Sequence, residues 1–135
     1  MLNLREKNIK MKTIFITGAT SGIGKATAET FAKQGHRLII CGRRKEVLEQ
    51  LQIELSNITE VYSLVFDVRN QEEVENAIHS LPEEWKNIDV LVNNAGNAHG
   101  LEPISEGNIA DWDAMMDGNV KGLLYVSQPI IKIMK

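Results

Sequence analysis

Short apolar runs alternate with amphipathic segments along most of the chain. The runs occupy residues 14–16, 37–41, 61–66 and 89–92. Each is largely continuous rather than alternating, which is typical of strands buried on both faces of a parallel sheet. We therefore predict four strands in a sheet that helices cover on both sides.

Apolar residues recur at helical spacing in the segments between these runs. They predict helices over residues 22–34, 47–55 and 70–81, and Gly35 stands where a glycine commonly ends a helix. Strand and helix therefore alternate, which defines the α/β class. The predicted fold is a Rossmann-type, doubly wound parallel sheet of about four strands, with the element order βαβαβαβα.

The ends of the chain differ from this pattern. Residues 97–107 are rich in Gly, Pro and polar side chains and predict a loop, after which Asn108 is a suitable cap for a long helix toward Lys135. Pro129 lacks a backbone donor, so we expect a kink or break near Gln128. Residues 1–11 are predicted to be a loose extension, with Met1 or Met11 as the start, and residues 12–135 a single domain that is incomplete at its C-terminus.

Composition narrows the classes of partner. Of 135 residues, 43% are hydrophobic and 24% charged, and the net charge is −3, with no basic block for a nucleic acid and no apolar run long enough for a bilayer. The single Cys41 lies in an apolar run and predicts a buried, reduced thiol, hence a cytoplasmic protein. His36, His79 and His99 have no metal-ligand spacing, so we expect ordinary surface or loop residues and no metal site.

Residues 17–24, called here the glycine-rich turn, follow the first strand and open the first helix. Their sequence is Thr-Gly-Ala-Thr-Ser-Gly-Ile-Gly. A helix N-terminus after such a turn binds phosphate groups through unpaired N–H groups and the helix dipole. The turn is not a P-loop, because Gly24-Lys25 is followed by alanine rather than a hydroxyl residue. The predicted phosphate-binding residues are Gly18, Thr20, Ser21, Gly22, Ile23 and Gly24.

Two arginines follow the second strand, where the adenosine ribose of a bound dinucleotide lies. A carboxylate there favours a free 2′-hydroxyl group, whereas arginine favours a 2′-phosphate. Gly42 takes the acid's usual place and is followed by Arg43 and Arg44, which predicts NADP(H) as the cofactor. The alternative is a pair of solvated charges in a surface turn.

Polar groups also follow the third and fourth strands. Asp67 and Val68 are placed to contact an adenine ring, with a cap for the next helix as the alternative role of Asp67. Residues 93–96, with sequence Asn-Asn-Ala-Gly, place Asn94, Ala95 and Gly96 beside the bound cofactor, unless they form a plain turn.

Together these residues resemble the short-chain dehydrogenase/reductase family. The resemblance rests on the Thr-Gly-x-x-x-Gly-x-Gly pattern of residues 17–24, on Asp67-Val68, on residues 93–96 and on Asn119 in the long helix, and it covers about residues 12–135. Residues 81–85, 88–92 and 100–103 further resemble a branch of NADP-dependent 3-hydroxy acid dehydrogenases that act on serine, allo-threonine and related small hydroxy acids.

The resemblance implies hydride transfer between NADP(H) and such a hydroxy acid. It also implies a catalytic Ser, a Tyr-x-x-x-Lys pair and an asparagine that holds a water in a proton relay, of which only the last carries over, to Asn119. Asn119 alternatively stabilises a local helix irregularity. Tyr62 and Tyr125 are followed four residues later by Phe66 and Pro129, so neither fits the Tyr-x-x-x-Lys pattern.

Two further expectations follow. The chain is either the cofactor-binding half of such an oxidoreductase, or a non-catalytic NADP-binding module or inactive truncated product. In the family's strand order 3-2-1-4-5-6 the fourth strand is interior. Because the sequence has no fifth or sixth strand, we expect residues 89–93 to form an uncovered apolar edge, which makes the chain poorly soluble or dependent on self-association. The family often forms dimers or tetramers, and a homo-oligomer is the implied state of the full-length form.

Overall fold

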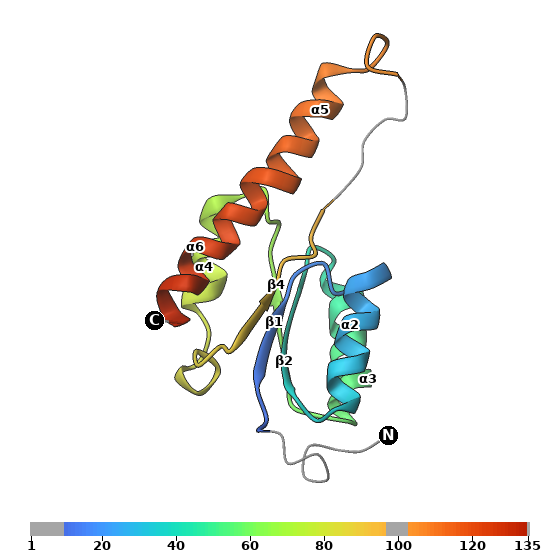
Figure 1. Cartoon of the computed structure of the whole chain (residues 1–135). Helices are drawn as coiled ribbons and strands as arrows, with labels where there is room; N and C mark the ends of the chain where they lie inside the picture. The colour runs from blue at the N-terminus through green and yellow to red at the C-terminus, as the bar shows by residue number, and fades with distance from the viewer. Residues whose placement is uncertain (1–9, 97–102, 135) are drawn as a thin grey trace.

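The computed structural model describes residues 10–96 and 103–134. Within them one four-stranded sheet has the order β3-β2-β1-β4, with every neighbouring pair parallel. Its strands are β1 (Thr13–Ile16), β2 (Arg37–Gly42), β3 (Val61–Val65) and β4 (Val90–Val92). The predicted order of the first four strands is confirmed, and β4 lies at an edge of the sheet (Figure 1).

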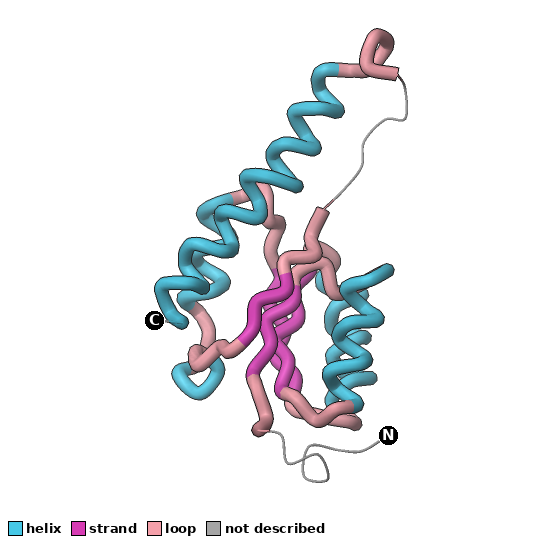
Figure 2. The backbone as a smooth tube through the Cα atoms, in the orientation of Figure 1, coloured by secondary structure: helices cyan, strands magenta, loops and turns pink. Residues whose placement is uncertain are grey.

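Helices cover both faces of this sheet, as predicted (Figure 2). α2 (Gly22–Lys33) and α3 (Lys45–Ser56) lie on one face. α4 (Gln71–His79) and α6 (Gly122–Met134) lie on the other. The short 3₁₀ helix η1 (Glu83–Trp85) precedes β4, and α5 (Ile109–Met115) and the π-helical segment η2 (Met116–Lys121) precede α6.

Alternate residues of each strand supply two separate apolar cores. Ile14 and Ile16 of β1 pack with apolar side chains of α2 and α3, whereas Phe15 packs toward α4 and α6. The same alternation holds in β2, where Ile40 faces the first core and Ile39 the second. A strand buried on both faces must be apolar throughout, which explains the continuous runs in the sequence.

The predicted end of the first helix is confirmed. Gly35 has φ of 88°, in the left-handed region that glycine adopts without steric cost, and its N–H donates to the Ala32 carbonyl. The alternative role of Asp67 as a helix cap is wrong. Asn70 caps α4 instead, since its side chain accepts from the Glu73 N–H at 3.1 Å.

The expected break near Gln128 is also wrong, because α6 continues through Pro129 to Met134. Proline removes one helical hydrogen bond, but Val126 and Ile130 on either side of it are fully buried against the sheet and hold the helix in place. The irregularity of the long helix lies earlier, in the π-helical turn η2 that contains Asn119. Asn108 caps α5 as predicted, accepting from the Ala110 N–H at 2.8 Å.

His36 lies in the loop before β2, as the prediction of a surface or loop residue allowed, but it is buried. It is 7% exposed, and its Nδ1 accepts a hydrogen bond from the Lys12 backbone N–H at 3.0 Å. Burial, together with the nearby Lys12 charge, lowers the pKa of His36. His79 is exposed, as predicted, and His99 lies outside the described residues. Cys41 is buried, as predicted, and burial raises the pKa of its thiol.

No helix in the described part of the chain combines the length and apolarity needed to cross a bilayer.

Candidate functional site

The glycine-rich turn joins β1 to α2 at the carboxyl end of the sheet. Gly18 and Gly22 have φ of 62° and 57°, which residues with a Cβ rarely adopt. A Cβ added at Gly22 would meet no atom within 4 Å, so the surface of the turn is open there. The first N–H groups of a helix have no partner within the helix, and such an N-terminus favours anions.

Gly24 is needed for a different reason. A Cβ at this position would overlap the Gly18 carbonyl and lie 2.5 Å from Nδ2 of Asn94. The same Asn94 amide donates to the Gly18 carbonyl at 3.2 Å. The start of α2, the turn and the end of β4 are therefore packed on one another at Gly24.

Thr17 fixes the turn to the segment after β4. Its Oγ1 accepts from the backbone N–H groups of Asn94 and Ala95, both at 3.0 Å, and lies 3.4 Å from the Val92 carbonyl, to which it donates. The sequence placed Thr17 in the motif without giving it a role. The sequence feature that could have revealed this role is the position of Thr17, a small hydroxyl residue directly before the first glycine of the turn.

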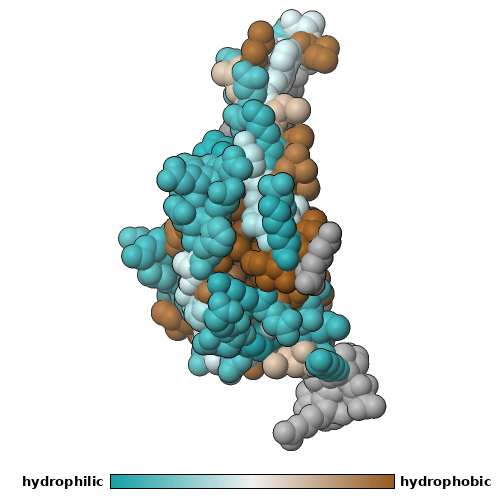
Figure 3. Space-filling model, turned by 90° about the vertical axis from the view of Figure 1, so that its left-hand side faces the viewer, coloured by the Kyte–Doolittle hydropathy of each residue, from teal (hydrophilic) through white to brown (hydrophobic). Residues whose placement is uncertain are grey.

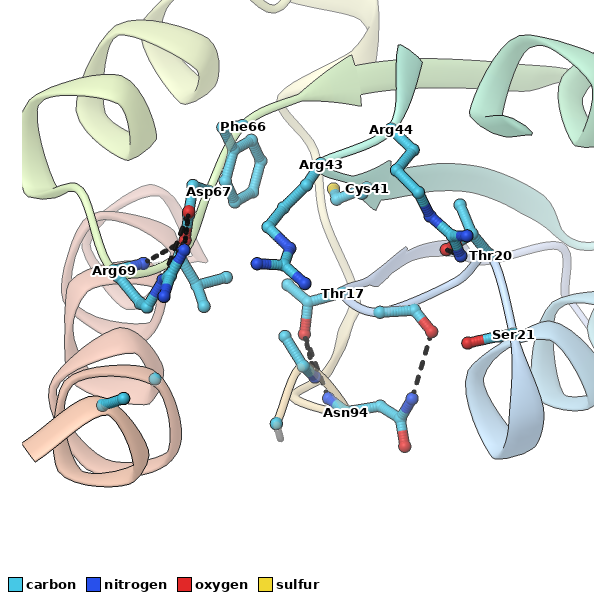
Figure 4. Close-up of a pocket in the computed structure, with 17 residues that line it drawn as sticks. Thr17, Thr20, Ser21, Cys41, Arg43, Arg44, Phe66, Asp67, Arg69 and Asn94 are labelled. Carbon is cyan, nitrogen blue, oxygen red and sulfur yellow. Dashed lines mark hydrogen bonds and ion pairs between the residues drawn. The ribbon is translucent and has the colours of Figure 1, made fainter. Parts of the chain in front are cut away.

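A pocket of about 340 Å³ opens at the carboxyl ends of all four strands (Figure 4). Such an edge is where ligands of open α/β sheets bind. The predicted site residues that line it come from four different loops, and they are Gly18, Thr20, Ser21, Arg43, Arg44, Asp67, Val68, Asn94, Ala95 and Gly96. Residues far apart in the sequence are thus brought together in one pocket.

The remaining predicted residues do not line this pocket. Gly22, Ile23 and Gly24 belong to the adjoining turn, and the Ile23 side chain is 77% exposed. Asn119 lies beside the pocket, because its Oδ1 would be 3.0 Å from a Cβ added at Gly96. Two roles were expected for Asn119: to hold a water in a proton relay, or to stabilise a local helix irregularity. Its place in the π-helical segment η2, next to Gly96, is compatible with both.

Several lining residues were missed by the sequence analysis. Cys41 and Phe66 end the second and third apolar runs, so their positions at strand ends were an available signal. Ala114 and Gly118 lie on the long helix and had no local signal, because only the packing of that helix brings them to the pocket. Arg69 also lines the pocket, and its pairing with Asp67 was not predicted.

The two arginines after β2 take different directions. Arg43 points toward the middle of the pocket, whereas Arg44 reaches Thr20 (Figure 4). Nη2 of Arg44 lies 3.4 Å from Oγ1 of Thr20. One guanidinium group therefore lies in the pocket and the other at the glycine-rich turn, and both suit a ligand that carries phosphate groups.

Asp67 forms a close ion pair with Arg69. Nη2 of Arg69 lies 2.8 Å from Oδ2, Nε bridges both carboxylate oxygens, and the Arg69 backbone N–H donates to Oδ1 at 2.9 Å. The Arg69 hydrogen bonds hold the pKa of Asp67 below its usual range, so the carboxylate is charged at neutral pH. The pair forms the side of the pocket next to the long helix (Figure 4).

The residues fit an anionic dinucleotide. The turn offers open backbone at Gly22, two guanidinium groups stand opposite, and small residues at 95 and 96 leave room beside the sheet. Among the described residues no cluster of three or more His, Cys, Asp and Glu side chains is placed to hold a metal ion.

Residues 12–135 match the sequence pattern of the short chain dehydrogenase family. The chain belongs to this family. Its truncated, Rossmann-like parallel sheet is the one that the resemblance in the sequence had implied.

The chain is similar to the branch that contains 3-hydroxy acid and serine dehydrogenases. The chain is 45% identical over 118 residues to an NADP-dependent 3-hydroxy acid dehydrogenase, YdfG, of Escherichia coli O6:H1, covering 87% of this chain and 47% of the relative. It is 44% identical to a serine 3-dehydrogenase of Rhizobium radiobacter, covering 88% and 47%. A solved serine dehydrogenase complexed with NADP+ superimposes with a TM-score of 0.82 at 43% identity, covering 90% of this chain and 48% of that one.

The chain spans about half the length of the curated relatives that it matches.

Proposed function

We propose that this chain binds NADP(H) and is the cofactor-binding half of an oxidoreductase. That enzyme transfers a hydride between NADP(H) and a small hydroxy acid or hydroxy amino acid. The observation that carries the proposal is the placement of Arg43 and Arg44 opposite the glycine-rich turn in one pocket. No carboxylate stands at the end of β2, where a preference for NAD would need one.

Each part of the pocket has a role in this proposal. The turn from Gly18 to Gly24 holds the pyrophosphate, the two arginines face the 2′-phosphate, and Asp67 with Val68 borders the adenine. Asn94, Ala95 and Gly96 border the nicotinamide side, where NADP supplies the hydride chemistry. Asn119 is proposed to hold a water in the proton relay, from its place next to Gly96.

The substrate class rests on the relatives. Proteins named as 3-hydroxy acid and serine dehydrogenases share about 45% of the residues of this chain over the aligned segments. A short hydroxy acid or hydroxy amino acid is therefore the substrate that we would test first.

Removal of one arginine tests the cofactor. We expect Arg43→Ala to weaken NADPH binding by roughly ten- to a hundredfold, because a hydrogen bond to a charged group contributes about 1.5–3 kcal/mol. NADH binding should change much less. Titration followed by nicotinamide fluorescence measures both constants.

Lys45→Ala is the matched control, since it removes a positive charge from a neighbouring, largely exposed side chain that does not line the pocket. Equal losses of NADPH and NADH affinity in Arg43→Ala would contradict the assignment of a 2′-phosphate site.

A second candidate, NADP(H) binding without turnover, is favoured by the lining of the pocket. Among the described residues, no Tyr, Lys or His lines it, so no side chain of these types supplies a general acid or base there. The chain would then bind NADPH and show no oxidation of serine or 3-hydroxy acids with NADP+. Turnover by this chain would exclude that candidate.

A further inference from the structure

Gly42 ends β2 inside the pocket, and its backbone does not require glycine. It pairs with Val65 in the regular register of the sheet. The described glycines with positive φ are Gly18, Gly22 and Gly35, and Gly42 is not among them. A residue with a side chain could adopt this conformation, so space must explain the glycine.

Thr20 fills the space that a side chain at position 42 would use. A Cβ on Gly42 would lie 2.9 Å from Cγ2 of Thr20, 3.6 Å from Cδ1 of Leu48 and 3.8 Å from Oγ1 of Thr20. The first distance is shorter than real Cβ contacts, so either the strand end or the threonine would have to move. Threonine is branched at Cβ and has few χ1 rotamers to choose from.

The hydroxyl of the same threonine faces the other way. Its Oγ1 is 3.4 Å from Nη2 of Arg44, so the methyl group faces the strand end while the hydroxyl group faces the guanidinium (Figure 4). One side chain of the glycine-rich turn therefore contacts both positions that decide which ribose fits: the glycine where a carboxylate would stand, and an arginine that would meet a phosphate.

We propose that Thr20 sets the dinucleotide preference, because its methyl group excludes a carboxylate at position 42 while its hydroxyl group orients Arg44 toward the 2′-phosphate. This inference rests on the proposed NADP(H) function. It assigns the preference to a coupled pair, Thr20 and Gly42, in addition to the arginines. A carboxylate introduced at position 42 then cannot create an NADH site unless Thr20 also changes.

A double-mutant cycle tests the coupling. Thr20→Ser removes only the blocking methyl group and keeps the hydroxyl group. The dissociation constants of NADPH and NADH are measured by fluorescence for the original chain, Thr20→Ser, Gly42→Asp and the double variant. We expect Gly42→Asp alone to lose NADPH affinity without gaining NADH affinity, and the double variant to bind NADH at least about tenfold more tightly than Gly42→Asp alone. An equal NADH affinity for these two variants would overturn the inference.

A second cycle needs no ligand and covers the case in which the aspartate variants fail to fold. We expect Gly42→Ala to lower the melting temperature by several degrees in the original chain, and by much less in the Thr20→Ser variant, because the overlap is with the methyl group. Equal losses in both backgrounds would overturn the steric part of the inference.

The two cycles also separate this inference from the proposed function. A chain that binds neither dinucleotide would refute the NADP(H) proposal and the preference with it, whatever the melting temperatures show. A chain that prefers NADPH but shows additive effects at positions 20 and 42 would keep the proposed function and overturn the role of Thr20.

Discussion

Gly24 shows how closely the start of α2 approaches the rest of the site. Its Cα hydrogen faces the Gly18 carbonyl and the Asn94 side chain, with no space for a methyl group. We expect Gly24→Ala to lower the free energy of unfolding by an amount at the upper end of about 1–3 kcal/mol, since the overlap is with backbone that cannot rotate away. Urea denaturation measures the loss.

Gly118→Ala is the matched control for that substitution. Gly118 is also a buried helical glycine, but a Cβ there would lie 3.8 Å from the Arg69 side chain, an ordinary contact. Because alanine favours the helix, stability should rise by up to about 1 kcal/mol. A similar loss at both positions would contradict the explanation by local space.

His36 predicts a pH dependence of stability. Its folded-state pKa is lowered, so the unfolded chain binds the proton more readily. The stabilisation by neutral His36 is therefore complete above the ordinary pKa of 6.5 and is lost as the pH falls through the lowered value. We expect the free energy of unfolding to fall as the pH drops below the ordinary pKa of 6.5, and His36→Asn to reduce that slope.

Urea denaturation of both chains at several pH values measures the two slopes. Asp67 does not confuse the comparison, because its pKa is lowered from 3.8 and its stabilisation is lost only at more acidic pH. Identical slopes for the original chain and His36→Asn would contradict the role of His36.

Residues differed in how far the sequence revealed them. The glycines of the turn were predictable because Gly18 and Gly22 answer a local backbone need. His36 was not, because its burial depends on the Lys12 N–H, which lies 24 residues away along the chain. The pairing of Asp67 with Arg69 is local, but whether Asp67 or Asn70 caps α4 depends on the exact start of the helix, which sequence patterns fix poorly.

The long helix from α5 to α6 shows what packing can override. Pro129 interrupts its hydrogen bonding, yet buried side chains on either side keep α6 continuous. We expect Pro129→Ala to raise the free energy of unfolding by about 1–3 kcal/mol, because residue 129 can then donate to the carbonyl four residues earlier. Thermal or urea denaturation measures the gain.

Gln128→Ala is the control, because this neighbouring side chain is exposed and the helix gains no hydrogen bond. Its effect should stay within about 0.5 kcal/mol. A loss of stability in Pro129→Ala would show that the proline ring contributes packing that outweighs the missing bond.

Elements were predicted best where a single periodicity runs through them. The four strands were found because burial on both faces requires apolar residues at every position, as in Ile14, Phe15 and Ile16. The position of the π-helical turn η2 was not predicted. A π-helical turn inserts one residue into an α-helix, and the apolar residues of the segment still recur at helical spacing. Asn119 had suggested an irregularity only through the family.

At the scale of the molecule, apolar side chains remain exposed along the long helix, and brown patches interrupt its hydrophilic surface (Figure 3). These exposed side chains include Ile109, Met116, Val120, Leu123, Leu124 and Ile131. Within residues 10–96 and 103–134, β4 pairs with a strand on one side only. We expect the chain to self-associate or to be poorly soluble, which size-exclusion chromatography with light scattering measures.

Leu124→Lys combined with Ile131→Lys should shift the chain toward smaller species, because it places charge on this surface. Ile53→Lys is the control, since Ile53 is 63% exposed on α3, away from the long helix. A sharp monomer peak with a cooperative melting transition for the unaltered chain would contradict this expectation.

The hydrogen bonds between the glycine-rich turn and Asn94 join positions 76 and 77 residues apart in the chain. No fragment that contains only one of these segments can therefore possess the pocket, however well its own strands and helices form. A ligand of this pocket binds only molecules in which the two distant segments are packed together. Its binding therefore stabilises the folded state in which these segments are in contact. Ligand-induced protection from unfolding is thus a measure of long-range assembly rather than of local structure in the turn.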